Sequence, residues 1–488
     1  MPCGQGVGVY IILPDIITMN IDKLKRLLAD SRRTEVWIFC FALIVKLAAS
    51  SILFAHNGLA LISEGDASGY LDIAKSVAAG EGFRADGIIS ALRTPLYPLF
   101  LSIFYFFHLS IALVPIVQII LLSYGSVLLY RIGSSFFSKN VGFIAAMLFS
   151  VEPLLLVYVN MALTESLFVF LLICSVYNLL KYFSDGSHTP LILSAILVGA
   201  TALIRPIGMY LPLLVLLLMI IKNRLEKKKA TAMLRPAFIY IALFIIVIAP
   251  WSVRNKLTFG SWSLTNHGAI EIYNERVPIV IAAKENIDYN SAFIINQKNL
   301  EKLIPNFSPT VMGNTFAYND ILARESFRVL SQNIPTVLKF HLIAAVSYFH
   351  TTGYDYVLRY FGIENTATTN NFTNFIFHRE WKPLIKAVIR TDLHNVVRLS
   401  GYMLWFVLNI SIAFSIVYDL RRSRRNLFAL LFLLGSILYF AVFSIGPHTQ
   451  ARYRIPTYPF LFILIGFATT IIGSRVKTYL KTRQKTTR

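Results

Sequence analysis

Runs of roughly 20 apolar residues, the length that crosses a bilayer as an α-helix, recur along the whole chain of 488 residues. Only helices and closed barrels satisfy their backbone polar groups inside a membrane. The composition agrees, because 56% of the residues are hydrophobic and 15% are charged, against about 25% charged in an average soluble domain. The sequence therefore predicts an all-α polytopic membrane protein.

The net charge of +21 has two explanations, nucleic-acid binding or basic cytoplasmic loops. The Lys and Arg clusters lie between apolar runs, at 23–33, 222–229, 421–425 and 475–488, which is the distribution that the positive-inside rule gives. We therefore expect membrane lipids and no nucleic acid as partners. The expected location is the plasma (inner) membrane, with several spans and both termini in the cytoplasm. The three cysteines have no spacing typical of a disulfide or a metal site.

Keeping every basic cluster on one side of the membrane resolves the ambiguous apolar segments. Residues 190–221 must cross twice, as a tight hairpin with Arg205–Pro206 at its outer tip. Segments 94–110 and 335–350 are expected to be re-entrant or surface helices on the outer side. About ten spans result, and the clear ones are 35–55, 112–132, 141–159, 166–183, 236–251, 397–419, 427–445 and 456–474.

This topology divides the chain into five parts. The basic segment after Met19 is typical of a cytoplasmic N-terminus, so both Met1 and Met19 are candidate starts of translation and Met19 is the expected one. Two outer segments are too long to be simple connectors, and long loops often carry function. The parts are 1–34 (cytoplasmic N-terminus), 35–251 (N-terminal transmembrane module with the first outer loop, 56–111), 252–396 (extracytoplasmic loop region), 397–474 (C-terminal transmembrane helices) and 475–488 (basic cytoplasmic tail).

The first outer loop contains its own helical pattern. Asp66 is a good N-cap residue, and Gly80 and Gly82 can end the helix. Apolar residues between them, from Tyr70 to Ala78, recur at the spacing of one helical face. The pattern predicts a short amphipathic helix lying on the membrane surface, with Asp66 and Tyr70 on one side of it.

Charged residues recur at the outer ends of the predicted spans. Each alone has a structural explanation, such as a helix cap or a snorkelling side chain. Charges at membrane depth, however, normally face a protein interior or a watery cavity. Two acids and several arginines on one side therefore indicate a cavity that binds an anionic head group and keeps a base. The set is Asp66, Arg93, Glu165, Arg205, Arg254, His448, Arg452 and Arg454.

Short motifs in this order resemble a known family. They are "RTPLYPLF" from Arg93, "TES" ending at Ser166, "LIRPIG" around Arg205, "PWSVRN" around Arg254 and "RYRIP" from Arg452. Their order and placement resemble the GT-C glycosyltransferases of the dolichyl-phosphate-mannose protein mannosyltransferase type (glycosyltransferase family 39). Bacterial aminoarabinose transferases are similar. The resemblance extends from about Val36 to Gly473.

The resemblance implies an inverting enzyme that takes a hexosyl or pentosyl group from a polyprenyl-phosphate donor at the outer face. The acceptor would be a lipid, a glycan or a protein. Asp66 would be the catalytic base and Glu165 a second catalytic acid, and Arg93 would contact the donor phosphate. The remaining outer arginines, Arg205, Arg254, Arg452 and Arg454, suit the same phosphate. Tyr70, Tyr97 and His448 are assigned to substrate binding.

Several points stay open at this stage. No metal-binding motif is present, so no cofactor is expected, although Asp66 and Glu165 could share a divalent ion. A polytopic transporter of a lipid-linked or anionic substrate is the alternative, but the charges gather at the outer ends rather than at the membrane midplane. A sugar-polymerising or ligating enzyme of another membrane family would also use outer arginines, but would lack the Asp66 loop helix.

Overall fold

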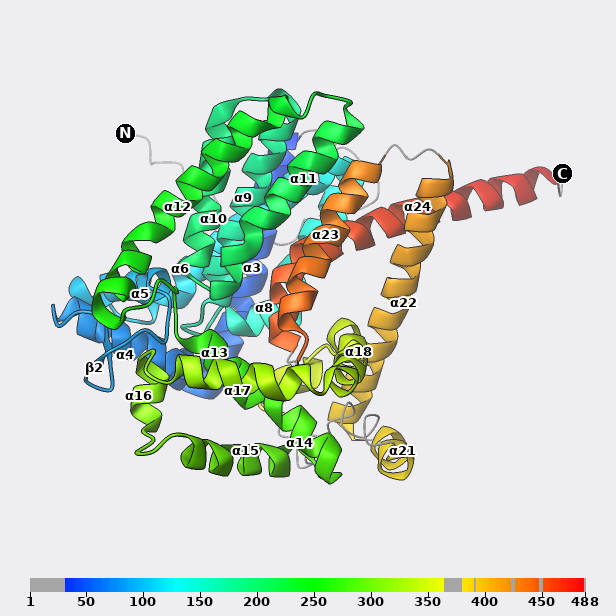
Figure 1. Cartoon of the computed structure of the whole chain (residues 1–488). Coiled ribbons are helices and arrows are strands. Elements are labelled where there is room, and N and C mark those ends of the chain that lie inside the picture. Colours follow the sequence, from blue (N-terminus) through cyan, green and yellow to red (C-terminus); the bar gives the residue numbers. More distant parts are fainter. Residues whose placement is uncertain (1–30, 364–379, 390–391, 423–425, 447–450, 487–488) are drawn as a thin grey trace, which may run out of the picture.

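The protein is described by a computed structural model that covers residues 31–363, 380–389, 392–422, 426–446 and 451–486. Eight helices in these ranges are long and apolar enough to cross a membrane. These helices are α3 (Ser31–Asn57), α6 (Leu113–Phe136), α9 (Glu165–Asp185), α11 (Leu211–Leu225) together with the short helix that precedes it from Pro206, α12 (Thr231–Phe259), α22 (Leu393–Arg422), α23 (Leu427–Ser444) and α24 (Tyr458–Thr486). In Figure 1 most of them run side by side, whereas α22 lies at the right-hand edge and α24 crosses obliquely.

Two shorter apolar helices, α7 (Lys139–Val151) and α10 (His188–Ala202), complete the bundle. After α7 the chain bends at Glu152, and α8 (Pro153–Tyr158) begins at a proline, which cannot donate a backbone hydrogen bond to a preceding turn. The predicted span 141–159 is therefore a broken helix. With these two, a helix lies at each of the ten predicted spans, so the all-α polytopic fold is confirmed.

The segment 190–221 forms the predicted hairpin. Helix α10 is followed by a turn at Arg205, by the short helix η3 (Pro206–Tyr210) and by α11. Pro206 opens η3, a position where its fixed φ angle and missing N–H are tolerated. The tip therefore places the Arg205 side chain at the end of the bundle.

The two other ambiguous segments are also helical. Helix α5 (Leu96–Phe106) has only 11 residues, too few to span a bilayer, in agreement with the prediction for 94–110. Helix α18 (Ile334–His350) follows α17 (Asn319–Ser331) after a bend of 92°, and the two would add a ninth crossing only if they formed one span. The location of residues 335–350 on the outer membrane surface stays a prediction.

Short helices from the first loop and from the loop region cover one end of the bundle (Figure 1). Part of this layer has a small core of its own, formed by Ile270, Tyr273, Leu300 and Leu322. The only strands in the described ranges are β1 (Arg84–Ala85) and β2 (Ile88–Ile89). The short helices are η2 (Gly58–Ser63), α4 (Ala67–Ala78), α13 (His267–Glu271), η4 (Ile272–Arg276), α14 (Val277–Glu285), α15 (Tyr289–Leu303), α16 (Pro309–Asn314), α19 (Tyr354–Tyr360), α21 (Trp381–Ile389) and η5 (Ala451–Thr457).

Glycines allow close helix contacts inside the bundle. A Cβ atom on Gly133 of α6 would lie 2.7 Å from the Cα of Gly142 on α7, and one on Gly466 of α24 would lie 2.7 Å from the carbonyl oxygen of Val141. Small residues at such crossings let backbones approach and pack in a membrane, where lipid is as apolar as the side chains. These contacts hold α6, α7 and α24 as the centre of the fold.

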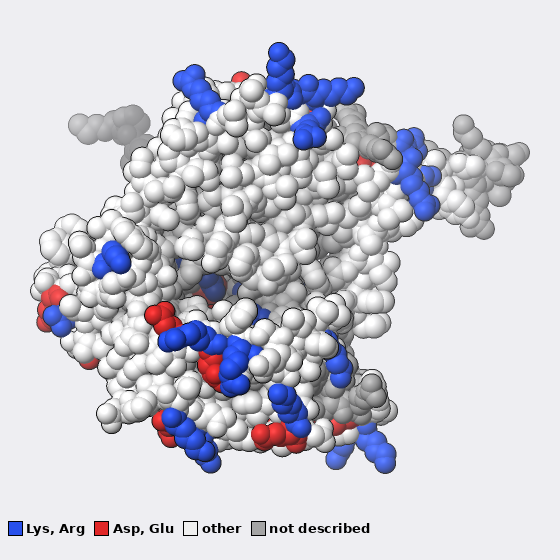
Figure 2. Space-filling model, in the orientation of Figure 1, with Lys and Arg blue, Asp and Glu red and all other residues white. Residues whose placement is uncertain are grey.

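Charged side chains are distributed unevenly over the surface. In Figure 2 they gather at the two ends of the bundle, and the surface of α9 to α12 and of α22 and α23 between them is largely uncharged. An uncharged belt between two charged ends is the surface expected of a protein that crosses a bilayer.

Candidate active site

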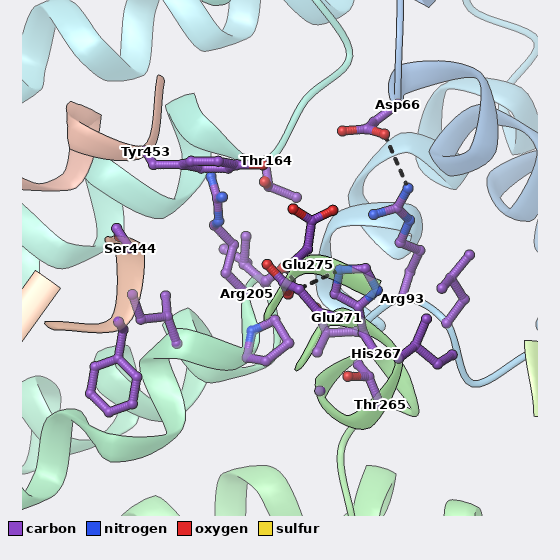
Figure 3. Close-up of a pocket in the computed structure, with 18 of the residues that line it drawn as sticks. Asp66, Arg93, Thr164, Arg205, Thr265, His267, Glu271, Glu275, Ser444 and Tyr453 are labelled. Atoms are coloured by element: carbon purple, nitrogen blue, oxygen red, sulfur yellow. Dashed lines mark hydrogen bonds and ion pairs between the residues drawn. The ribbon is translucent and has the colours of Figure 1, made fainter. Parts of the chain in front are cut away.

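A cavity of about 450 Å³ lies at the end of the bundle that the short helices cover. It brings together six of the ten residues that the sequence assigned to a site. These six, which come from five separate parts of the chain, are Asp66, Tyr70, Arg93, Glu165, Arg205 and Arg452. The predicted convergence of distant charges therefore occurs. Glu165 pairs with Arg205. Asp66 pairs with Arg452 and Arg93, and Figure 3 marks its contact with Arg93.

Asp66 lies between η2 and α4, at the N-cap position of α4 as predicted. Its side chain makes no capping hydrogen bond, so the predicted capping interaction is wrong. Instead, Oδ2 accepts a hydrogen bond of 2.8 Å from Nη2 of Arg452, and Oδ1 lies 3.7 Å from Nη2 of Arg93. The carboxylate thus bridges two arginines that are separated by more than 350 positions in the sequence.

Arg93 is positioned by the segment that leads into α5. The Thr94 hydroxyl donates to the carbonyl of Ile204 at 2.7 Å, which fixes this segment against the turn that carries Arg205. The guanidinium of Arg93 lies 4.6 Å from the ring centroid of Tyr70, a cation–π contact. Tyr97 packs edge-on against Tyr70 at 5.4 Å and so supports this arrangement.

Glu165 is the first residue of α9, and its side chain is only 4% exposed. Its Oε1 lies 2.9 Å from Nη1 of Arg205. The positive end of the helix dipole also favours a carboxylate at this position. The loop before α9 is fixed by Gln118, whose amide donates to the carbonyls of Val159 and Met161 at 2.9 and 3.0 Å.

Arg452 and Tyr453 belong to η5, between the last two long helices. The Arg452 guanidinium lies 5.2 Å from the ring centroid of Tyr453, and in Figure 3 the Tyr453 ring borders the side of the cavity near Arg205. Because η5 directly precedes α24, the C-terminal half of the chain supplies one of the two arginines that hold Asp66.

The opposite wall of the cavity was not anticipated from the sequence. It comes from α13 and η4, a stretch with π-helical backbone, which is rare and frequently found at functional sites. Nε2 of His267 lies 3.3 Å from Oε2 of Glu271, and Nδ1 of His267 is buried with no partner among the described residues. This polar wall consists of His267, Glu271, Asn274, Glu275 and Arg276.

Local charges shift several pKa values in the cavity. Partial burial raises the pKa of Asp66, but the charges of Arg452 and Arg93 and the Arg452 hydrogen bond outweigh it, so the pKa lies below its ordinary value. Burial lowers the pKa of His267 despite the opposing effect of Glu271. Burial, together with the charge of Glu271, raises the pKa of Glu275 to about 7. Among the described residues, no group of three or more His, Cys, Asp or Glu side chains is placed to hold a metal ion.

Arg254 and Tyr97 do not line the cavity. Arg254 donates to the carbonyl of Ser90 at 3.0 Å and lies over the Trp251 ring at 4.6 Å, so it braces the segment before Arg93. The hydroxyl of the buried Tyr97 donates to Gln118 Oε1 at 3.0 Å. Both residues therefore contact segments that position the cavity residues, and neither contacts the cavity itself. His448, predicted to bind substrate, lies outside the described residues.

Arg454, predicted to bind phosphate, is also away from the cavity and is fully buried. Nη1 donates to the carbonyls of Tyr348 and Phe349 at 3.2 and 2.8 Å, and the guanidinium lies 4.1 Å from the Trp405 ring centroid. The side chain thus joins η5 to α18 and α22. Its contacts are those of a residue that stabilises the fold.

Replacing Arg454 with Leu is expected to destabilise the protein by about 3 kcal/mol, the size of effect seen when a buried charged network loses one partner. The reason is that two carbonyls and the Trp405 ring lose their contact. Thermal unfolding in detergent measures the change. Arg475→Leu is the control, because Arg475 is an exposed residue in the second half of α24 whose guanidinium lies 4.3 Å from the ring centroid of Tyr418. Equal unfolding temperatures for Arg454→Leu and the unchanged protein would contradict this role.

The cavity opens toward the uncharged belt. Figure 2 shows a hollow with acidic and basic side chains inside it, next to the surface of α11 and α23. Ile207 and Phe443 line the cavity at this side. The Phe443 ring stacks on Tyr210 with centroids 5.1 Å apart, and the two residues are 44% and 41% exposed. An apolar, aromatic mouth therefore connects the charged interior with the lipid-facing surface.

Comparisons with known proteins agree with this geometry. Residues 93–253 match the family model described as dolichyl-phosphate-mannose-protein mannosyltransferase. The matched part includes Arg93, Glu165 and Arg205, which all line the cavity. A search of curated proteins finds no match.

The fold is similar to that of the oligosaccharyltransferase of Archaeoglobus fulgidus. Its apo form matches with a TM-score of 0.51 and 13% identity over 92% of this chain and 52% of that one. The complex of the same enzyme, AglB, with an inhibitory peptide and a dolichol-phosphate has a TM-score of 0.50 and 13% identity, over 91% and 52% of the two chains. The present chain thus spans about half the length of these structures.

The fold and the family match together confirm the resemblance read from the sequence. The chain is a polytopic membrane protein whose fold is similar to that of an archaeal oligosaccharyltransferase.

Proposed function

We propose that this protein transfers a single hexosyl or pentosyl group from a polyprenyl-phosphate donor to an acceptor at the outer face of the plasma (inner) membrane. The observation that carries the proposal is a cavity with arginines inside and an apolar mouth toward the lipid. A lipid with one anionic phosphate needs both features. Arg93, Arg205 and Arg452 would bind the phosphate, and the prenyl chain would leave past Tyr210 and Phe443.

In the proposed reaction, an acceptor hydroxyl or amine attacks the anomeric carbon of the donor sugar. The new bond forms as the bond between that carbon and the phosphate oxygen breaks, and its electron pair stays on the phosphate. The acceptor proton passes to the Asp66 carboxylate, and attack from the face opposite the phosphate inverts the anomeric centre. The arginines stabilise the charge that develops on the leaving phosphate. Glu165 holds Arg205 in place for this purpose.

The arrangement has one wall for each substrate. One wall, which contains Arg93, Arg205 and Arg452, lies at the ends of the membrane helices, where a lipid phosphate would lie. The wall of His267, Glu271, Asn274 and Glu275 comes from the loop region rather than from the membrane helices, so we assign it to the sugar hydroxyls and to the acceptor, which would be a lipid, a glycan or a protein. Arginines neutralise the phosphate in this scheme, and no step requires a divalent metal.

A transfer assay tests the proposal. The purified full chain is reconstituted into vesicles with a panel of polyprenyl-phosphate sugars and a membrane extract as the acceptor source, and products are read by mass spectrometry. We expect one class of polyprenyl-phosphate sugar to be consumed, in excess EDTA as well as without it. No consumption of any lipid-phosphate sugar would contradict the function, and movement of an intact donor across the vesicle without bond cleavage would support a transporter instead.

A further inference from the structure

We infer that Asp66 occupies the anion site of the two arginines until the donor phosphate replaces it, so that phosphate binding is the event that frees the base. This inference rests on the proposed function and concerns the regulation of the same site. It starts from the contacts that the Asp66 carboxylate makes with two arginines.

The geometry of Asp66 is that of a ligand rather than of a free base. Its two carboxylate oxygens face two guanidinium groups, at 2.8 Å for Arg452 and 3.7 Å for Arg93. A phosphate presents oxygens to guanidinium groups in the same way. A carboxylate in such contacts is a poor proton acceptor, because its negative charge is already neutralised.

The two arginines are equipped to take a larger anion. The Nε atoms of both Arg93 and Arg452 are buried and have no hydrogen-bond partner among the described residues. Each guanidinium therefore has donors that Asp66 leaves unused. A phosphate has more acceptor oxygens than one carboxylate, so it can take the guanidinium donors that Asp66 now occupies and still has acceptors left for others.

The two acids in the cavity differ in how easily they can be displaced. Glu165 is 4% exposed and is fixed at the start of α9 beside Arg205, whereas the Asp66 side chain is 44% exposed and sits at the start of a short helix. Movement of Asp66 away from the arginines exposes it to water at little cost, while movement of Glu165 would leave a charge buried. Asp66 is therefore the acid that yields to the donor.

The exchange couples donor binding to proton transfer. Once phosphate neutralises Arg93 and Arg452, the Asp66 carboxylate loses the two charges that suppress its basicity. It can then accept the acceptor proton. Without a donor the base stays engaged, so an acceptor alone is not activated.

Binding of an anionic probe separates this inference from simpler roles of Asp66. The probe is methyl farnesyl phosphate, a diester with one negative charge, and farnesol is its neutral counterpart. Titration calorimetry uses the purified full chain in detergent and compares the unchanged protein with Asp66→Asn and Asp66→Ala. The control is Asp72→Asn, which makes the same change on the same helix at an exposed residue that does not line the cavity.

We expect both Asp66 variants to bind the diester about tenfold more tightly than the unchanged protein, a change equivalent to about 1.4 kcal/mol. Farnesol binding and the Asp72→Asn variant should show no change. Equal or weaker diester binding by folded Asp66→Asn and Asp66→Ala would overturn the inference. If the unchanged protein and the variants alike fail to prefer the diester over farnesol, the proposed function itself fails. Gel filtration shows which variants are folded.

Discussion

Replacing Asp66 with Asn is expected to lower the turnover rate of glycosyl transfer by about 10²–10⁴-fold, the usual contribution of a general base. The amide has nearly the same shape as the carboxylate but cannot take the acceptor proton. Initial rates with the donor found in the panel assay measure the effect. The donor KM should fall or stay constant while kcat collapses, since the amide no longer competes with phosphate for Arg93 and Arg452.

The control for this variant is Asp72→Asn, for which we expect an unchanged rate. A purely structural role of Asp66 would lower the folded yield and weaken donor binding together. An Asp66→Asn protein with kcat close to that of the unchanged chain would exclude Asp66 as the base. His267, which contacts Glu271 and lines the same cavity, would then be the next candidate for the base.

Replacing Arg205 with Gln is expected to reduce kcat/KM by about 10²–10³-fold, as does removal of one group that stabilises charge in a transition state. Arg205 lines the cavity beside Glu165, and its charge is placed to meet the leaving phosphate. Arg205→Lys should recover only part of the activity, because an ammonium group cannot make the two parallel hydrogen bonds of a guanidinium.

Arg205 also pairs with Glu165, so the Arg205→Gln variant changes stability as well as catalysis. A second substitution, at Glu165, separates the two effects. Arg205→Gln leaves a buried carboxylate without its partner, which destabilises the fold. In the double variant with Glu165→Gln that charge is absent, so thermal stability should return while transfer stays low. Recovery of both properties in the double variant would mean that Arg205 serves only to neutralise Glu165.

The sequence was sufficient to predict an all-α polytopic fold. Hydrophobic length identifies most spans directly, and the basic clusters constrain the rest, as the hairpin around Arg205 demonstrates. What it could not predict is local backbone detail. Broken helix α7–α8 and the π-helical η4 depend on packing against other parts of the chain, which leaves no periodic signal in the sequence.

The site could be predicted in part for a related reason. Five site residues are unusual because they are charged and lie next to apolar segments, which the sequence alone shows. They are Asp66, Arg93, Glu165, Arg205 and Arg452. Arg454 shows the same anomaly, but its guanidinium meets backbone carbonyls and Trp405 in the interior. The wall around His267 lies in a polar loop region where charges are ordinary, so the sequence contains nothing to distinguish it.

The pairing of Asp66 with Arg452 has a consequence for biosynthesis. The ribosome delivers the chain from its N-terminus, so the carboxylate reaches its membrane position while most later helices are still untranslated. Its guanidinium partner Arg452 follows 386 positions later, in η5. A chain inserted only as far as α23 therefore still lacks one of the two arginines that hold Asp66.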